Sequence, residues 1–241
     1  MKNLLAIDTA TDALSLALQV DGERASRHQV MPRRHQQLLF AEIEALCGGR
    51  ALASLNLDAI VYGQGPGSFT GLRIAVSAAQ GLAYSLGLPA LGVSTLETQL
   101  RTLLRHHADL RAPAIYLSTI DARIGQLYGA FFAFDGTGIR SLGAPVIAEA
   151  GALALPDEAR ALADLPVRVL GSGLAYRDAM PAEWKSGNED WAQVLPEARD
   201  MLAPAEQLLA AGQVAAPGDA QPDYVQQKVG WKTLAEQGKR A

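Results

Sequence analysis

The stretch GQGPGSFTGLRIAVSAAQGLAYSLG, residues 63–87, joins a glycine-rich turn to a long run of small side chains. Gly65 and Gly67 allow positive φ angles and close backbone approach, and Ser68 or Thr70 can cap the helix that follows. The first amides of such a helix suit an anion. The Walker A lysine is missing, however, and the glycine spacing does not fit G-x-G-x-x-G. The stretch alone therefore favours a strand-to-helix turn that sets the direction of the helix.

The predicted helix over 70–87 is unusual because small side chains cover much of it, which lets another helix approach closely. These small residues are Ala75, Ser77, Ala78, Ala79, Gly81, Ala83 and Ser85. Composition favours close packing inside this chain over packing against another protein, and both interpretations stay open. Arg73 lies in the first turn, where the helix dipole disfavours a cation, so it is a candidate for a specific contact.

Apolar runs on both sides of this stretch predict an α/β sheet of mixed direction. We predict strands at 3–9, 14–20, 24–30, 58–62 and 89–93, and helices at 35–47 and from 94 to about 107. Asp21-Gly22 is a tight hairpin signal, so the first three strands are expected to be antiparallel.

Ala112-Pro113 marks a predicted boundary between two subdomains, 1–111 and 112–241. In the second subdomain we predict strands at 114–121, 126–134 and 167–171, helix and loop over 143–166, a loop at 185–190 and a short helix at 201–212. The polar tail at 232–241 is expected to lack fixed structure.

Bulk properties restrict the possible functions of the 241-residue chain. Its net charge of −4 gives no excess of basic residues, so any contact with an RNA backbone is expected to be shared with a partner. Cys47 is the only cysteine, which excludes an intrachain disulfide and a zinc cluster. The apolar N-terminal run reaches Asp8 too soon for a signal peptide, and no apolar stretch approaches transmembrane length. We therefore expect a cytoplasmic protein without membrane attachment.

The first predicted hairpin places Asp8, Thr9 and Thr11 around a turn. Hydroxyls and backbone amides at such a turn can bind phosphate oxygens, and Asp8 could hold a metal-bound water. These three residues are the candidate nucleotide-binding residues. The alternative, which this motif alone favours, is a polar turn in which Asp8 accepts local backbone hydrogen bonds.

Several segments together resemble the bacterial TsaB (YeaZ-type) family, whose members help to make N6-threonylcarbamoyladenosine on tRNA. The segments are NLLAIDTATDALSLAL (3–18), PRRH (32–35), GQGPGSFTGLRIAVSAAQGLA (63–83), LPALGVSTLE (88–97) and IDARIGQLY (120–128). The resemblance covers about the first 130 residues strongly and returns weakly at PDYVQQKVGWK (222–232). There Gln226 stands where the family commonly has an arginine.

The resemblance implies the actin/Hsp70/sugar-kinase (ASKHA) fold, with two α/β subdomains of which the second is reduced. The catalytic relative, TsaD, carries an H-x-x-x-H metal site where this chain has Thr95 and Gln99. A hydroxyl and an amide cannot replace two imidazoles as ligands of a catalytic transition metal. The resemblance therefore implies a subunit with no catalytic residue, no metal and no cofactor of its own.

The family uses its first two helices, here 35–47 and 70–87, to pair with TsaD. The implied interface residues are Leu38, Leu39, Ile43, Arg73, Ile74, Ala78 and Leu82. The resemblance also implies TsaE and ATP as needs of the complex, tRNA bound through the complex, and a homodimer when the chain is alone. Pairing predicts that Ala78→Trp blocks co-purification with TsaD while leaving the fold intact.

Two other functions stay open as alternatives. One is a small kinase on the same fold, which would need a catalytic carboxylate near its substrate and a complete second half. The other is a peptidase acting on its partner, for which the sequence offers no readable Ser-His-Asp pattern and no G-x-S-x-G elbow.

Overall fold

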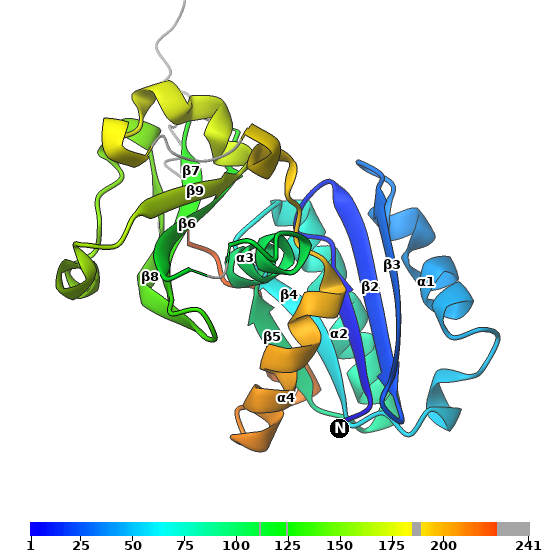
Figure 1. Ribbon diagram of the computed structural model, residues 1–241. Helices are drawn as coiled ribbons and strands as arrows, with labels where there is room; N and C mark the ends of the chain where they lie inside the picture. The colour runs from blue at the N-terminus through cyan, green and yellow to red at the C-terminus, as the bar shows by residue number, and fades with distance from the viewer. Residues whose placement is uncertain (111, 124, 185–188, 226–241) are drawn as a thin grey trace, which may run out of the picture.

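The chain folds around two β-sheets (Figure 1). The computed structural model describes residues 1–110, 112–123, 125–184 and 189–225. The first sheet has the strand order β3-β2-β1-β4-β5. Its strands are β1 (Leu4–Asp8), β2 (Ala13–Val20), β3 (Glu23–Val30), β4 (Ala59–Gly65) and β5 (Ala90–Ser94). β1, β2 and β3 are antiparallel neighbours, whereas β4 runs parallel to both β1 and β5. The predicted sheet of mixed direction is confirmed.

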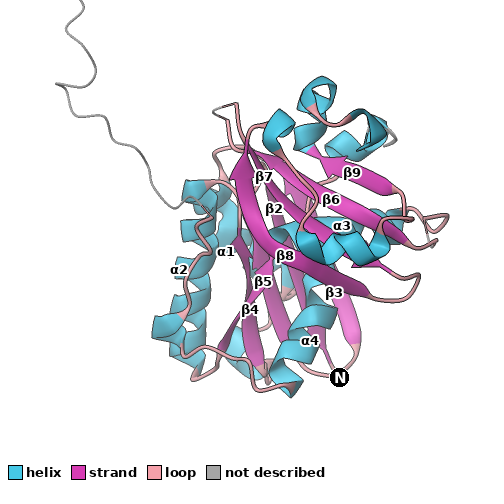
Figure 2. Cartoon of the chain, turned by 90° about the vertical axis from the view of Figure 1, so that its left-hand side faces the viewer, coloured by secondary structure: helices cyan, strands magenta, loops and turns pink. Residues whose placement is uncertain are grey.

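Two helices, α1 (His35–Leu46) and α2 (Phe69–Leu86), cover one face of this sheet (Figures 1 and 2). The ends of α2 follow from the glycine-rich stretch. The Ser68 side chain accepts a hydrogen bond from the Gly71 N–H at 3.3 Å, which caps the first turn. Gly87 ends the helix with a left-handed φ of 67°, a conformation that glycine adopts without a Cβ penalty.

The opposite face of the first sheet is covered by residues from much later in the chain. The 3-10 turn Ala198–Met201 and helix α4 (Leu202–Ala210) pack there against alternate side chains of β1, β4 and β5. The segment that follows returns to the same half, where Ala215 pairs with Ala90 and the Asp223 N–H donates to the Gln64 carbonyl at 2.7 Å. The predicted subdomain 112–241 is therefore wrong for residues 198–225, which complete the first half.

The second sheet has the order β8-β7-β6-β9. Its strands are β6 (Ala114–Asp121), β7 (Leu127–Phe134), β8 (Ile139–Ala148) and β9 (Val167–Gly171). β6, β7 and β8 are antiparallel neighbours and β9 runs parallel to β6, so this sheet repeats the pattern of the first four strands of the chain. Short 3-10 turns follow β8 and β9 in place of α1 and α2. Two α/β halves with the second reduced are thus observed.

The prediction of helix and loop from residue 143 onwards is wrong at its start, because strand β8 continues to Ala148. Only Leu142 is fully buried along this edge strand, so its side chains do not alternate between apolar and polar. The loop predicted at 185–190 lies mostly outside the described residues, and the tail predicted at 232–241 lies wholly outside them.

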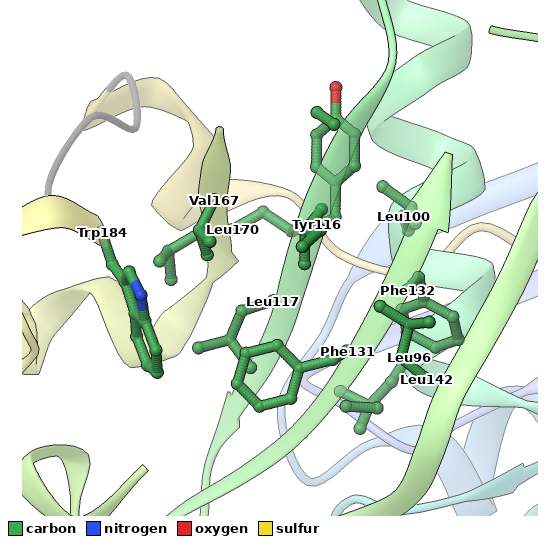
Figure 3. Close-up of a cluster of buried hydrophobic side chains, with 14 of the residues drawn as sticks. Leu96, Leu100, Tyr116, Leu117, Phe131, Phe132, Leu142, Val167, Leu170 and Trp184 are labelled. Atoms are coloured by element: carbon green, nitrogen blue, oxygen red, sulfur yellow. The ribbon is translucent and has the colours of Figure 1, made fainter. Parts of the chain in front are cut away.

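Helix α3 (Thr95–His106) joins the two halves. Its side chains Leu96 and Leu100 are fully buried in the core of the second sheet, where Phe131 of β7 lies edge-on to Trp184 (Figure 3). Because α3 follows β5 directly, it ties the end of the first sheet to the second core. Within the described ranges, no helix has both the length and the apolar content needed to span a bilayer.

Candidate functional site

The carboxylate of Asp8 lies at the end of β1, fully enclosed. Its Oδ1 accepts the Ala10 N–H at 3.0 Å, whereas its Oδ2 has no hydrogen-bond partner within the part of the chain that is described. A Cβ at Gly63 would lie 2.0 Å from that oxygen, so glycine is needed to make room. Burial raises the pKa of Asp8 to about 6, with the Ala10 amide and the nearby Thr95 hydroxyl opposing the rise.

The first turn of α2 packs directly against the turn between β1 and β2. The Thr9 hydroxyl donates to the Gly71 carbonyl at 2.7 Å, and the Ser68 N–H donates to the Ala10 carbonyl at 2.7 Å. A Cβ at Gly71 would lie 1.9 Å from the Thr9 carbonyl oxygen. Glycine at this position is therefore what allows the helix to start against the hairpin.

These contacts correct the predicted nucleotide-binding set. Asp8 and Thr9 are buried and engaged within the hairpin and with α2, so neither presents its side chain at the surface. Thr11 alone lines a cavity of about 590 Å³ beside the first turn of α2. Arg123 of the second half reaches this cavity and pairs with Asp12 at 3.4 Å.

Thr95 and Gln99 lie one turn apart on α3, with both side chains buried. The Thr95 hydroxyl accepts the Gly65 N–H at 3.2 Å. The Gln99 amide donates to the Val194 carbonyl at 2.7 Å and accepts from the Ser118 hydroxyl at 2.6 Å. Thr95 thus fastens the start of α3 to β4 of the first sheet, whereas Gln99 bonds to β6 of the second sheet. Among the described residues, no three His, Cys, Asp or Glu side chains gather closely enough to hold a metal ion.

Three of the predicted interface residues are part of this chain's own core. Leu39 is 2% exposed, Ile43 3% and Ala78 6%, and all three pack against the first sheet. These three residues are therefore core residues of this chain, whereas the sequence had placed them at the surface that contacts a partner. Ala78→Trp would therefore damage the fold and cannot isolate an effect on pairing. Leu38, Ile74 and Leu82 are half-buried around the same core.

Exposed aromatic residues occupy the outer side of the same two helices, and they were missed by the sequence reasoning. Phe40 of α1 is 59% exposed, and Phe69 and Tyr84 of α2 are 55% and 82% exposed. The Arg73 guanidinium lies 3.8 Å from the Phe69 ring centre, and its Nε donates to the Tyr224 hydroxyl at 3.2 Å. A helical projection that separates aromatic from aliphatic positions would have found them.

The comparisons with known proteins agree with this arrangement. A family model described as TsaD, tRNA N6-adenosine threonylcarbamoyltransferase, matches residues 27–218. The tRNA threonylcarbamoyladenosine biosynthesis protein TsaB of Escherichia coli K12 is 36% identical over 231 residues, which cover 96% of this chain and 97% of that protein. This chain belongs to the TsaB family.

Two further TsaB-family relatives bear on the fold and its extent. YeaZ from Pseudomonas aeruginosa superposes with a TM-score of 0.81 at 33% identity, covering 93% of this chain and all of that one. TsaB of Bacillus subtilis is 36% identical over 132 residues, or 54% of this chain. The TsaB fold therefore extends over both halves, and the predicted α/β fold with two subdomains, the second of them reduced, is confirmed.

Proposed function

We propose that this chain is a non-catalytic subunit that supports the transfer of threonylcarbamoyl from threonylcarbamoyl-AMP to N6 of the adenosine next to the tRNA anticodon. It would do so by pairing with TsaD, which would carry out the transfer. The observation that carries the proposal is the state of Thr95 and Gln99 on α3. Both are buried and hydrogen-bonded to their own chain, where the catalytic relative is expected to have two histidines.

The surface that supports pairing is the outer side of α1 and α2, called here the docking face. Its members are Phe40, Phe69, Arg73, Ser77, Gly81 and Tyr84, all exposed. Large exposed aromatic side chains on neighbouring helices are typical of protein–protein contacts. Ser77 and Gly81 form a shallow strip between the aromatic residues, which allows a partner helix to approach closely. Burial of apolar surface there would stabilise the pair by about 25 cal/mol per Å².

The remaining partners follow from the same proposal. The complex would need TsaE and ATP, tRNA would be bound jointly, and the docking face would pair two copies of this chain when TsaD is absent. A small kinase is less well supported, because the Asp8 and Thr9 side chains that would serve the phosphates are buried and engaged within the chain.

Gly81→Trp tests the pairing. A Cβ at Gly81 meets nothing within 4 Å, so this variant should fold normally while its indole blocks the close approach of a partner helix. We expect loss of co-purification with TsaD and at least a tenfold fall in tRNA modification reconstituted with TsaD and TsaE.

Gln207→Trp, at an exposed position of α4 on the other side of the sheet, is the matched control and should keep both activities. Thermal unfolding of both variants checks the fold. Full co-purification of a folded Gly81→Trp variant would contradict the proposal, as would unchanged tRNA modification when this chain is omitted.

A further inference from the structure

A second cavity, of about 510 Å³, lies on the side of the first sheet away from the docking face. Four arginines line it: Arg24 of β3, Arg101 and Arg105 of α3, and Arg199 just before α4. The turn between β7 and β8 closes its far side. Elements of both halves therefore bring four positive charges together in a chain whose net charge is −4.

Two of these arginines are balanced by carboxylates. Arg101 pairs with Glu97 at 2.7 Å, and Arg105 pairs with Glu197 at 2.6 Å and with Asp200 at 2.9 Å. Asp200 is the one acidic residue lining the cavity, and it shares the Arg105 guanidinium with Glu197, so its charge is only partly offset. The fixed pairs hold Arg101 and Arg105 in place, and each of the three carboxylates is engaged by an arginine.

The other two arginines are not balanced in this way. The Arg24 Nε donates to the amide oxygen of Gln19, and neither Arg24 nor Arg199 forms an ion pair within the residues that the structure describes. Both are exposed. Arg24 does lie near enough to Glu206 for its positive charge to lower the pKa of that carboxyl. An anion placed in the cavity would be attracted by both exposed guanidinium groups.

We propose that this arginine cavity binds a phosphate group of an RNA backbone. The guanidinium fork matches two phosphate oxygens at once. Because the unpaired arginines are exposed at the rim, a backbone that continues beyond the cavity can reach them. The choice of RNA rests on the proposed function, in which tRNA is the substrate. The acidic remainder of the surface would confine the RNA to this contact.

The location of the cavity would allow the chain to bind RNA and TsaD at the same time. Helices α1 and α2, which carry the docking face, lie on one side of the first sheet, and α4 lies on the other side (Figure 1). The arginine cavity is lined by residues of α3 and α4. TsaD on one side and RNA on the other would not compete for surface. The chain would then contribute a weak RNA contact that adds to the contacts made by its partner.

The test is a double variant, Arg24→Ala with Arg199→Ala, in the full-length chain. Neither arginine forms an ion pair among the described residues, so their removal leaves no carboxylate without its salt-bridge partner, and the fold should be kept. The control is Arg50→Ala with Arg160→Ala, which removes two positive charges at positions outside the cavity. Binding of a fluorescently labelled tRNA transcript is followed by anisotropy over a series of salt concentrations, with inorganic phosphate titrated separately.

We expect the double variant to bind tRNA about tenfold more weakly than the control, with the slope of log K against log salt smaller by about 1 for each arginine removed. Equal binding by the two double variants would overturn the proposal. It would also be overturned if phosphate, but not tRNA, responds to the substitutions. Co-purification with TsaD, scored on the same proteins, reports the docking face separately, so that failure of the RNA contact and failure of pairing are distinguishable.

Discussion

The two halves of the molecule end their first strand in the same way and then differ in what covers that end. Asp8 ends β1 and Asp121 ends β6. In each case Oδ1 accepts the N–H two residues further on, Ala10 at 3.0 Å and Arg123 at 2.8 Å. Asp8 is nevertheless buried and Asp121 only half-buried. The shared strand order fixes the turn, whereas its surroundings decide the chemistry of the carboxylate.

The element after the fourth strand of each half causes this difference. In the first half, a long helix begins at once, and Gly71 lets its first turn close over the hairpin. In the second half, β9 leads through Gly171 into the 3-10 turn Ser172–Ala179, and the Ser172 hydroxyl accepts the Asp121 N–H at 2.8 Å. A helix shields the turn from water and a short 3-10 turn does not.

The largest effect is expected from breaking the close contact of the first half with Gly71→Ala. The added Cβ would lie 1.9 Å from the Thr9 carbonyl oxygen, and a buried backbone cannot move aside cheaply. We expect a loss of about 4 kcal/mol in the free energy of unfolding, above the usual range for overpacking. Urea unfolding measures it. Gly81→Ala on the same helix is the control and should gain about 1 kcal/mol; similar losses at both sites would disprove the contact.

A second experiment uses pH to separate the two aspartates. Asp8 titrates near 3.8 when unfolded and at about 6 when folded, so the folded state keeps its proton between these values and the unfolded state releases it. Stability from this group is present below the unfolded pKa and falls by about 3 kcal/mol as pH rises to 6. Asp8→Asn should remove this slope, as seen in denaturant midpoints from pH 4 to 7.

The half-buried Asp121 provides the matched control for that experiment. Asp121→Asn should leave the slope attributable to Asp8 in place. If the wild-type chain and Asp8→Asn respond to pH alike, then the carboxylate is not enclosed as described, and the contrast between the halves is lost.

The smallest of the three effects concerns the link between the halves. Gln99→Ala removes the amide that bonds to Ser118 and Val194, leaving a buried hydroxyl and a partly buried carbonyl without this partner. We expect a loss of about 2 kcal/mol, measured by thermal unfolding. Thr137→Ala, on the exposed β7–β8 turn, should lose much less. Equal losses in the two variants would show that Gln99 does not join the halves.

Sequence patterns predicted the first half better than the second for a physical reason. Strands β1 and β2 are buried on both faces and form apolar runs, and α2 has a serine cap and a terminal glycine, so local signals agree with the fold. Strand β8 is an exposed edge with Gly143 and Pro145 inside it, and such a strand gives no alternation. No local signal could show that α4 packs on the first sheet, because that contact joins distant parts of the chain.

Three of the predicted interface residues lie in the core, and these errors have one cause. Leu39, Ile43 and Ala78 were chosen because they are apolar or small and lie on the right helices, but those properties also describe residues that bury against the chain's own sheet. Thr95 and Gln99 came from the family resemblance, and their internal hydrogen bonds were visible only in three dimensions. The four arginines of the cavity are spread from residue 24 to residue 199, beyond the reach of any local pattern.

The return of residues 198–210 to the first sheet has a consequence for biosynthesis. Strand β1 is made first, yet one of its faces is covered only by Met201, Leu202 and their neighbours. While the ribosome is still synthesising the second half, that apolar face is exposed to solvent, and exposed apolar surfaces promote aggregation. We therefore expect the nascent chain to be protected by chaperones, and a product that ends before residue 198 to be insoluble when expressed alone.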